Sequence, residues 1–293
     1  MLSPDKIGLI GFVVIFILSF ALHDIGGSRS PKYRDLEKEP RRPPVTGLSE
    51  DRRPSITSPG PILPPISPRD PTLQLMPSAK GNSTGTAFSI GQGIWMTARH
   101  VLEGCKKYGI FVGKGRVARG YERVLNPYHD LATFKTKPGG PSFSFAKGEL
   151  RFGQNAYHFG YPQGKPAALH STLLGRVNIS PGRKSRHKEP VIAWAEVRRV
   201  PKFSGSLGGI SGGPVLDSEG TIIGVSVVES RRRGRIFTAA PRGMQDMLRR
   251  GRVELSSVKG AKIREKINSM QFADIGQRLR KRRSVSKVVC WVD

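Results

Sequence analysis

The pattern of apolar and polar residues changes along the chain. After about residue 80, short runs of apolar and β-branched residues are separated by glycine, proline and polar turns. Runs of this length and composition predict β-strands, and they favour an all-β barrel or sandwich of Greek-key type between about residues 81 and 240. The predicted strands are TAFSI, GIWMTA, YGIFVG, LATFK, AYHFG, TLLGRVNI, VIAWAEV, TIIGVSVV and RIFTAA. The following segment, PRGMQDMLRR, predicts a helix that presents Met244, Met247 and Leu248 on one face.

The N-terminal region contains an apolar run from Ile7 to Leu22 that is interrupted only by glycines and Ser19. The run is shorter than the roughly 20 residues that span a membrane, and it equals or exceeds the ~7–15 residues of a signal-peptide core. Ser19 and Ala21 have the small-x-small spacing of a cleavage site. We therefore expect residues 1–27 to be a signal anchor, an N-terminal membrane helix, or a cleaved signal peptide. Both alternatives place the rest of the chain outside the cytoplasm, periplasmic or extracellular, and the length of the run favours the anchor.

Proline, serine and charged residues dominate residues 28–78, which we predict to be a disordered, semi-rigid linker. Residues 79–250 then form the folded domain, and residues 251–293 form a basic C-terminal tail with short helices. The cluster RLRKRR makes this tail a candidate for contact with an anionic surface. Because the tail lacks aromatic stacking platforms and groove-reading motifs, we expect no specific nucleic-acid partner.

Composition adds two constraints. The 37% apolar content supports a packed core, and a formal net charge of +27 favours contact with polyanions. Two cysteines, Cys105 and Cys290, exclude a dense disulfide framework. Whether they pair stays open, with two separate thiols slightly favoured. We predict no metal and no cofactor.

Three motifs within the predicted β domain carry candidate chemistry. GTAFSIGQGIWMTARHV contains His100, NPYHDLATFK places Asp130 directly before a strand, and GGISGGPV holds Ser211 in a glycine-rich loop. A serine hydroxyl becomes a strong nucleophile when an imidazole accepts its proton and a carboxylate orients that imidazole. Gly209 allows a backbone amide to turn into the site beside the amide of Ser211, where both would stabilise an oxyanion.

These motifs resemble those of the trypsin-like, chymotrypsin-fold serine proteases. TARHV is similar to the T-A-x-H motif, HDLATFK to the D-L-A-x-x-K segment and GGISGGPV to the G-x-S-G-G-P loop. The short spacing between His100 and Asp130, FGYPQG and IFTAAPRGM resemble the bacterial HtrA (Deg) branch, without the PDZ domain that usually follows. The resemblance implies two perpendicular six-stranded Greek-key β-barrels with the catalytic triad between them. It assigns His100 as general base, Asp130 as orienting acid and Ser211 as nucleophile, with the amides of Gly209 and Ser211 as the oxyanion hole.

The same resemblance implies a serine endopeptidase that acts on protein or peptide substrates. Gly205 and Ser206 would lie at the base of the primary pocket, and the segment GVSVVES, including Val225, Ser226 and Val227, would form its wall. Since neither base residue carries a carboxylate, we expect small or medium apolar side chains to be preferred. The alternative function is a catalytically silent, exported binding or scaffold protein on the same fold. His129, beside Asp130, is expected to be structural.

Overall fold

A computed structural model describes residues 60–75, 81–180, 188–230, 234–253 and 265–292. All of them belong to one compact unit, residues 55–293. The predicted signal anchor at residues 1–27 lies outside the described residues. Within the described ranges, no helix is long and apolar enough to cross a membrane.

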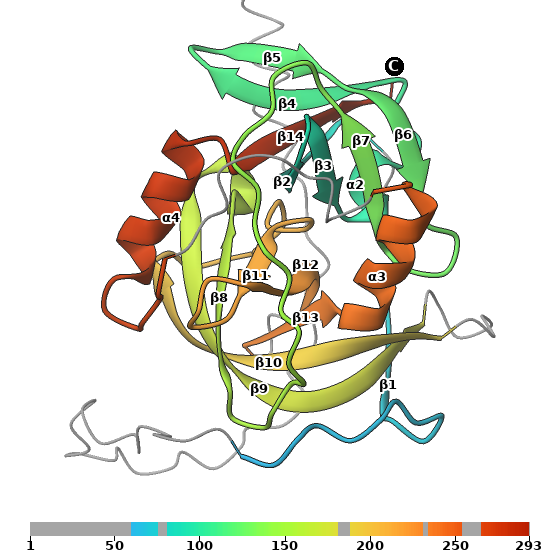
Figure 1. Ribbon diagram of the computed structural model, residues 1–293, viewed down its shortest axis with the longest axis vertical. Helices are drawn as coiled ribbons and strands as arrows, with labels where there is room; N and C mark the ends of the chain where they lie inside the picture. Colours follow the sequence, from blue (N-terminus) through green and yellow to red (C-terminus); the bar gives the residue numbers. More distant parts are fainter. Residues whose placement is uncertain (1–59, 76–80, 181–187, 231–233, 254–264, 293) are drawn as a thin grey trace, which may run out of the picture. The chain divides into compact units, whose positions relative to one another are not determined.

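The first half of the domain, together with β14 from the C-terminal segment, forms a sheet of seven strands in the order β5-β4-β14-β2-β3-β7-β6 (Figure 1). Its neighbouring strands are antiparallel. A short helix, α2 (Arg99–Leu102), follows β3. The strands are β2 (Ser83–Gly91), β3 (Ile94–Thr97), β4 (Lys107–Gly113), β5 (Arg116–Arg119), β6 (Tyr121–Leu125), β7 (Ala132–Lys135) and β14 (Val285–Trp291).

The C-terminal segment contributes to the interior of this sheet. After α4 (Phe272–Lys281), the chain forms β14, which pairs with β2 on one side and β4 on the other. A disulfide joins Cys290 of β14 to Cys105, which follows α2, with the two Cα atoms 5.4 Å apart. The expected short helical tail is therefore helical only in part, and the slightly favoured alternative of two separate thiols is wrong. The run VSKVVCW forms a strand because its valines and Cys290 are buried and its backbone pairs with a strand on each side.

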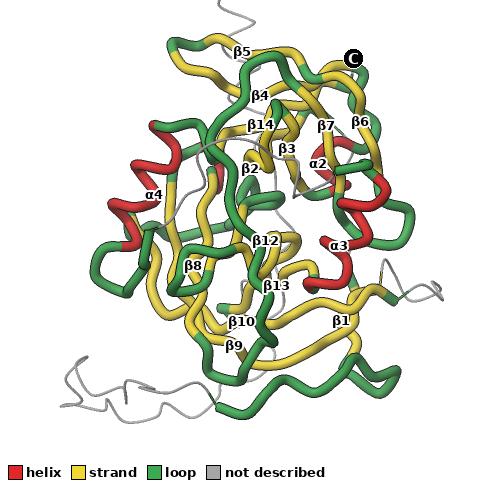
Figure 2. The backbone as a smooth tube through the Cα atoms, in the orientation of Figure 1, coloured by secondary structure: helices red, strands yellow, loops and turns green. Residues whose placement is uncertain are grey.

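The second sheet closes on itself, because β8 pairs with both β11 and β9. Figure 2 shows β8, β9, β10, β12 and β13 of this sheet among the strands drawn in yellow. A ring of six strands, β8 to β13, results, and it agrees with one of the two six-stranded barrels expected. The first sheet differs, with seven strands and no pairing between its end strands β5 and β6 among the described residues. The ring strands are β8 (Asn155–Gly160), β9 (Ala167–Ser180), β10 (Glu189–Val200), β11 (Pro214–Leu216), β12 (Ile222–Ser230) and β13 (Arg235–Ala239), with a 3-10 turn η1 (Pro162–Gly164) after β8.

Part of the predicted disordered linker is ordered against this barrel. Strand β1 (Thr72–Gln74) pairs parallel with β9, and Leu63 is only 4% exposed. The backbone amide of Gly60 donates to the carbonyl of Phe152 at 2.8 Å. The prediction of a linker up to residue 78 was therefore wrong for residues 60–75. Proline is compatible with such an edge segment because it has no backbone N–H, and few backbone amides of an edge segment need a partner in the sheet.

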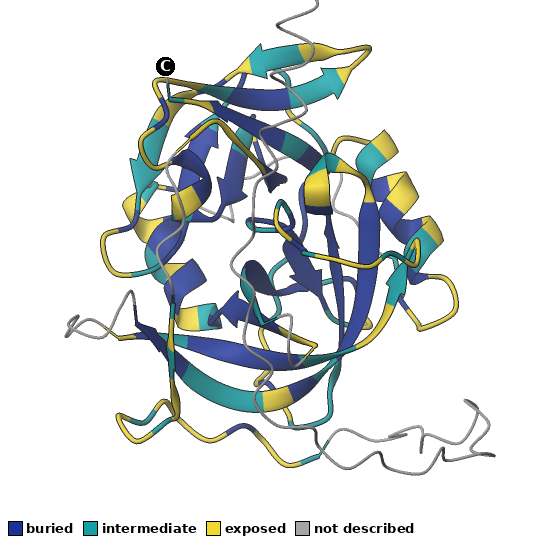
Figure 3. Ribbon diagram, turned by 180° about the vertical axis from the view of Figure 1, so that it is seen from behind, coloured by how far each residue is buried: buried dark blue, intermediate teal, exposed yellow. Residues whose placement is uncertain are grey.

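Two longer helices each bury one face on the sheets (Figure 3). Helix α3 (Pro241–Arg250) buries Met244, Met247 and Leu248, which confirms the predicted helix and its apolar face. Helix α4 buries Phe272, Ile275, Gly276 and Leu279, and its other residues are half-buried or exposed. The α4 helix thus leads the chain back to the first sheet, where β14 begins.

Candidate active site

His100 lies in a short helix whose last two residues are buried in the core. Strand β3 ends at Thr97, whose hydroxyl donates to the carbonyl of Thr86 at 2.7 Å. In α2, Val101 and Leu102 are buried. The His100 side chain remains 45% exposed. The buried neighbours therefore fix the backbone while the imidazole stays accessible.

Asp130 contacts His100 through both carboxylate oxygens. Its Oδ2 lies 2.6 Å from His100 Nδ1, and its Oδ1 accepts the backbone N–H of His100 at 2.9 Å. The loop that carries Asp130 is shaped by Asn126, whose Oδ1 accepts the amides of Tyr128 and His129 at 2.9 and 3.1 Å. Two contacts from one carboxylate fix the orientation of the imidazole and favour the tautomer with the proton on Nδ1.

The pair shifts the pKa of each partner toward its charged form. Burial lowers the pKa of His100, but the charge and hydrogen bond of Asp130 outweigh burial, so the pKa is raised above 6.5. Because 45% of the His100 side chain is exposed, the carboxylate of Asp130 determines the direction in which the pKa of His100 shifts. Burial raises the pKa of Asp130, but the charge and hydrogen bonds of His100 bring it below 3.8. Asp130 is therefore ionised at neutral pH, as an orienting acid must be.

A second carboxylate, which the sequence did not reveal, supports Asp130 from the other sheet. Glu189, at the start of β10, is 6% exposed, and its Oε1 accepts the backbone N–H of Asp130 at 2.8 Å. The same oxygen lies 3.7 Å from Nδ1 of His129. His129 therefore contacts the carboxylate that supports the Asp130 loop, while His100 contacts Asp130 itself. No sequence signal links Glu189 to this loop, because the two are 59 residues apart.

The loop of Ser211 packs against the strands that lead to His100. The carbonyl of Ser211 accepts the amide of Thr86 at 2.8 Å, and the Thr86 hydroxyl donates to the carbonyl of Gly209 at 2.7 Å. A Cβ on Gly212 would lie 2.1 Å from both the Thr86 carbonyl oxygen and Thr97 Oγ1. Only glycine allows this approach, which brings the loop against the end of β3, directly before α2.

The side chain of Ser211 donates to the carbonyl of Val227 in β12, at 3.3 Å. This is a long contact, close to the limit for a hydrogen bond between oxygens. The hydroxyl is therefore held weakly, and rotation about a single bond releases it.

The expected oxyanion-hole amides have the freedom that such a role needs. Gly209 has φ of +100°, and a Cβ there would lie 2.5 Å from the carbonyl oxygen of Tyr161, so this position requires glycine. The preceding carbonyl, of Gly208, accepts the amide of Gln163 at 2.6 Å, which fixes the peptide plane between Gly208 and Gly209. Among the described residues, the amides of Gly209 and Ser211 donate no hydrogen bond to a backbone or side-chain group.

The predicted pocket residues have unequal access to solvent. Gly205 is exposed and Ser206 is half-buried, whereas Val225, Ser226 and Val227 are buried. Ser226 Oγ lies 3.2 Å from Nδ1 of His158, a histidine fully buried in the same barrel. The accessible part of the segment GVSVVES is therefore its end, from Val228 to Ser230.

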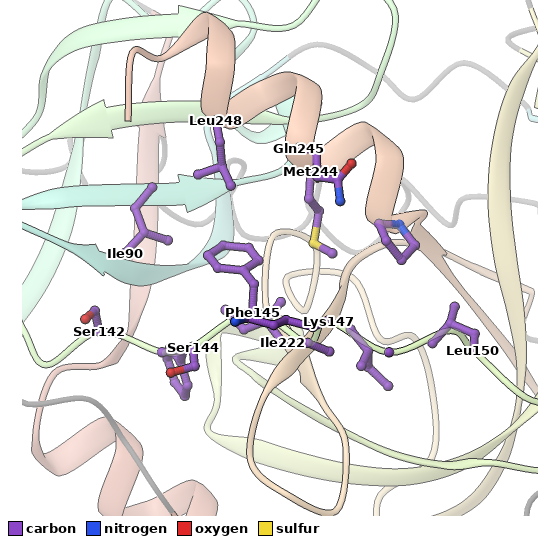
Figure 4. A pocket seen from close by; sticks show the side chains of 15 residues that line it. Ile90, Ser142, Ser144, Phe145, Lys147, Leu150, Ile222, Met244, Gln245 and Leu248 are labelled. Atoms are coloured by element: carbon purple, nitrogen blue, oxygen red, sulfur yellow. The ribbon is translucent and has the colours of Figure 1, made fainter. Parts of the chain in front are cut away.

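A separate cavity of about 540 Å³ lies between α3 and residues 142–150. Figure 4 shows Met244 and Leu248 of α3 facing Phe145 across it. His100, Asp130 and Ser211 do not line this cavity. The cavity is therefore not part of the candidate active site.

Comparison with known proteins agrees with this geometry. Residues 85–225 match the model of the trypsin-like peptidase domain, and the matched range includes His100, Asp130 and Ser211. Residues 85–225 are therefore similar to a trypsin-like peptidase domain. The Rv3671c protease of M. tuberculosis, in its active form, has the same fold with a TM-score of 0.50 and 17% identity. That alignment covers 69% of this chain and 96% of the Rv3671c structure.

Two curated proteins are also similar to part of this chain. The uncharacterised protein y4bJ of Sinorhizobium fredii is 30% identical over 164 residues, which cover 54% of this chain. The candidate serine protease HhoA of Synechocystis is 27% identical over 143 residues, which cover 48% of this chain. The alignments span only 24% of y4bJ and 36% of HhoA. Both similarities are therefore confined to a part of each protein.

Proposed function

We propose that this protein is a serine endopeptidase in which Ser211 is the nucleophile, His100 the general base and Asp130 the orienting acid. The observation that carries the proposal is the double contact of Asp130 with His100, at 2.6 Å to Nδ1 and 2.9 Å to the backbone N–H. With Nδ1 engaged, Nε2 is the ring nitrogen left to accept a proton.

In the proposed reaction, Ser211 Oγ attacks the carbonyl carbon of the scissile bond while His100 Nε2 takes the hydroxyl proton. The amides of Gly209 and Ser211 donate to the oxyanion of the tetrahedral intermediate. His100 then gives its proton to the departing amine, which leaves Ser211 as an acyl ester. Water, deprotonated by His100, hydrolyses the ester and restores the serine.

The location outside the cytoplasm is part of the proposal. The apolar run from Ile7 to Leu22 supports export. The disulfide between Cys105 and Cys290 adds support, because such bonds persist in oxidising compartments. Mass spectrometry of the mature N-terminus would separate an anchored from a cleaved form. An intact N-terminus is expected for an anchor.

Cleavage of a quenched peptide library by the purified protein tests the proposed reaction. Ser211→Ala and His100→Ala should each lower kcat by at least about 10³-fold, and the double variant should lose little more, since the residues act as one unit. The matched control is Ser218→Ala, a serine in the turn after β11. Activity that survives Ser211→Ala would contradict the proposal, and unchanged melting temperatures of all variants would show that the fold is intact.

A further inference from the structure

Glu229 lies on the strand that borders the candidate nucleophile. Ser211 Oγ donates to the carbonyl of Val227 in β12, and Glu229 follows two residues later on the same strand. Beyond Val225, β12 has no ladder with β11, although it still pairs with β13. Glu229 is half-buried, unlike the fully buried Val225 and Ser226. It is therefore the acidic residue at the accessible end of this segment.

The carboxylate of Glu229 bridges β12 to the loop that precedes Ser211. Its Oε1 accepts the hydroxyl of Ser206 in a short hydrogen bond, and its Oε2 accepts the amide of Leu207 at 2.7 Å. Ser206 also accepts the amide of Gly208 through Oγ, at 2.9 Å. The carboxylate thus lies against Ser206, one of the two residues that the sequence assigned to the base of the primary pocket.

The charge of Glu229 has no direct counter-ion among the described residues, since both of its donors are neutral. The pKa of Arg199 is raised mainly by the hydrogen bond that its guanidinium donates to Glu196, and the charge of Glu229 contributes less. The ion pair of Arg199 and Glu196 is bidentate: Arg199 Nε lies 2.5 Å from Glu196 Oε1, and Arg199 Nη2 lies 2.6 Å from Glu196 Oε2. The guanidinium of Arg199 is therefore committed to Glu196, and within the ranges that the structure describes no lysine or arginine forms an ion pair with Glu229.

The backbone beside Ser206 is accessible to solvent at Gly205. Gly205 is exposed with φ of +108°, and a Cβ placed there would meet only the side-chain amide of Gln163, at 3.0 Å. A long, flexible side chain that entered beside Gly205 would bring its charged end toward the carboxylate of Glu229.

We propose that Glu229 determines primary specificity and selects substrates with lysine or arginine immediately before the scissile bond. The inference rests on the proposed endopeptidase function and reverses the apolar preference expected from Gly205 and Ser206 alone. A charge-assisted hydrogen bond to Glu229 would anchor the cationic side chain, whereas an apolar side chain would leave the carboxylate without a counter-ion.

The test compares two fluorogenic peptides that differ only in the residue before the scissile bond, lysine or valine. For the native protein, kcat/KM should be about 10- to 100-fold higher for the lysine peptide, the range expected of a charge-assisted hydrogen bond. In Glu229→Gln this ratio should fall to near one. The matched control is Glu219→Gln, which removes the same charge from an exposed residue in the turn after β11 and should leave the ratio unchanged.

Labelling by a fluorophosphonate without a peptide moiety separates this inference from the proposed function, because labelling reports an activated serine regardless of substrate specificity. Labelling together with a native preference for valine would overturn the inference and leave the proposed function standing. The absence of labelling in the native protein would overturn both. If Glu229→Gln lost labelling as well as cleavage, the lysine preference of the native protein would still decide the inference.

Discussion

The disulfide between Cys105 and Cys290 should stabilise the domain strongly, because it closes a loop of 185 residues. In the chain-entropy model, a cross-link over so long a loop raises the free energy of unfolding by about 5 kcal/mol. For a domain of this size, each kcal/mol corresponds to roughly 2–4 °C in melting temperature. Replacing both cysteines with alanine should therefore lower the melting temperature by about 10–20 °C.

The fold itself should survive this change, because β14 remains hydrogen-bonded to β2 and β4. Circular dichroism should show unchanged strand content at 20 °C and the lower melting temperature on heating. Adding dithiothreitol to the native protein should give the same shift, and it should leave the double variant unaffected. A shift below about 3 °C in both experiments would refute the argument, since the cross-link would then impose little constraint on the unfolded chain.

Three other predictions concern the site and the sheet beside it. Because Asp130 raises the pKa of His100 above 6.5 and the neutral imidazole is the proposed base, kcat/KM should rise with pH through a midpoint above 6.5. Asp130→Asn should lower kcat sharply and move this midpoint down, and an unmoved midpoint in a pH–rate profile would contradict the pairing. Glu189→Leu should lower kcat about 10-fold with little change in KM, because it leaves the buried amide of Asp130 unpaired. Glu189→Gln keeps an acceptor oxygen and should retain most activity. Steady-state kinetics that show equal losses for both variants would refute a positioning role for Glu189. Val288→Asp should cost at least about 3 kcal/mol, because it places an unpaired charge in the middle of the first sheet, and an unchanged urea midpoint would argue against β14 as an integral strand.

The sequence predicted the strands whose signal is local. Every predicted run overlaps an observed strand: for example, GIWMTA overlaps β3 and RIFTAA overlaps β13. These runs are apolar enough to be buried on one or both faces, and turn residues separate them. Two of the strands that were missed, β5 and β6, have half-buried or exposed residues throughout, so their periodicity is weak.

The positions of β1 and β14 could not be predicted from local patterns. The run containing Cys290 is visibly apolar, but its partners β2 and β4 lie far away in the sequence. Strand β1 has only three residues and follows a proline-rich stretch, which favours the prediction of a linker. In both cases the strand is defined by long-range pairing, and the pairing of Cys105 with Cys290 depends on it.

The candidate catalytic residues were predictable because their motifs are short and contiguous around His100, Asp130 and Ser211. The supporting residues were not. Glu189 reaches the amide of Asp130 from the other sheet, and Glu229 reaches Ser206 from a neighbouring strand. Neither belongs to a motif, so only the fold shows what each carboxylate contacts.

The most direct test of the central claim is to identify the residue that a fluorophosphonate modifies. The native protein should gain one probe mass, and peptide mapping by mass spectrometry should place it on Ser211. Labelling carried out at a pH below the pKa of His100 should be slower than labelling above it, because a protonated imidazole cannot accept the serine proton. Modification of a different serine, or equal labelling of Ser211→Ala, would contradict the account.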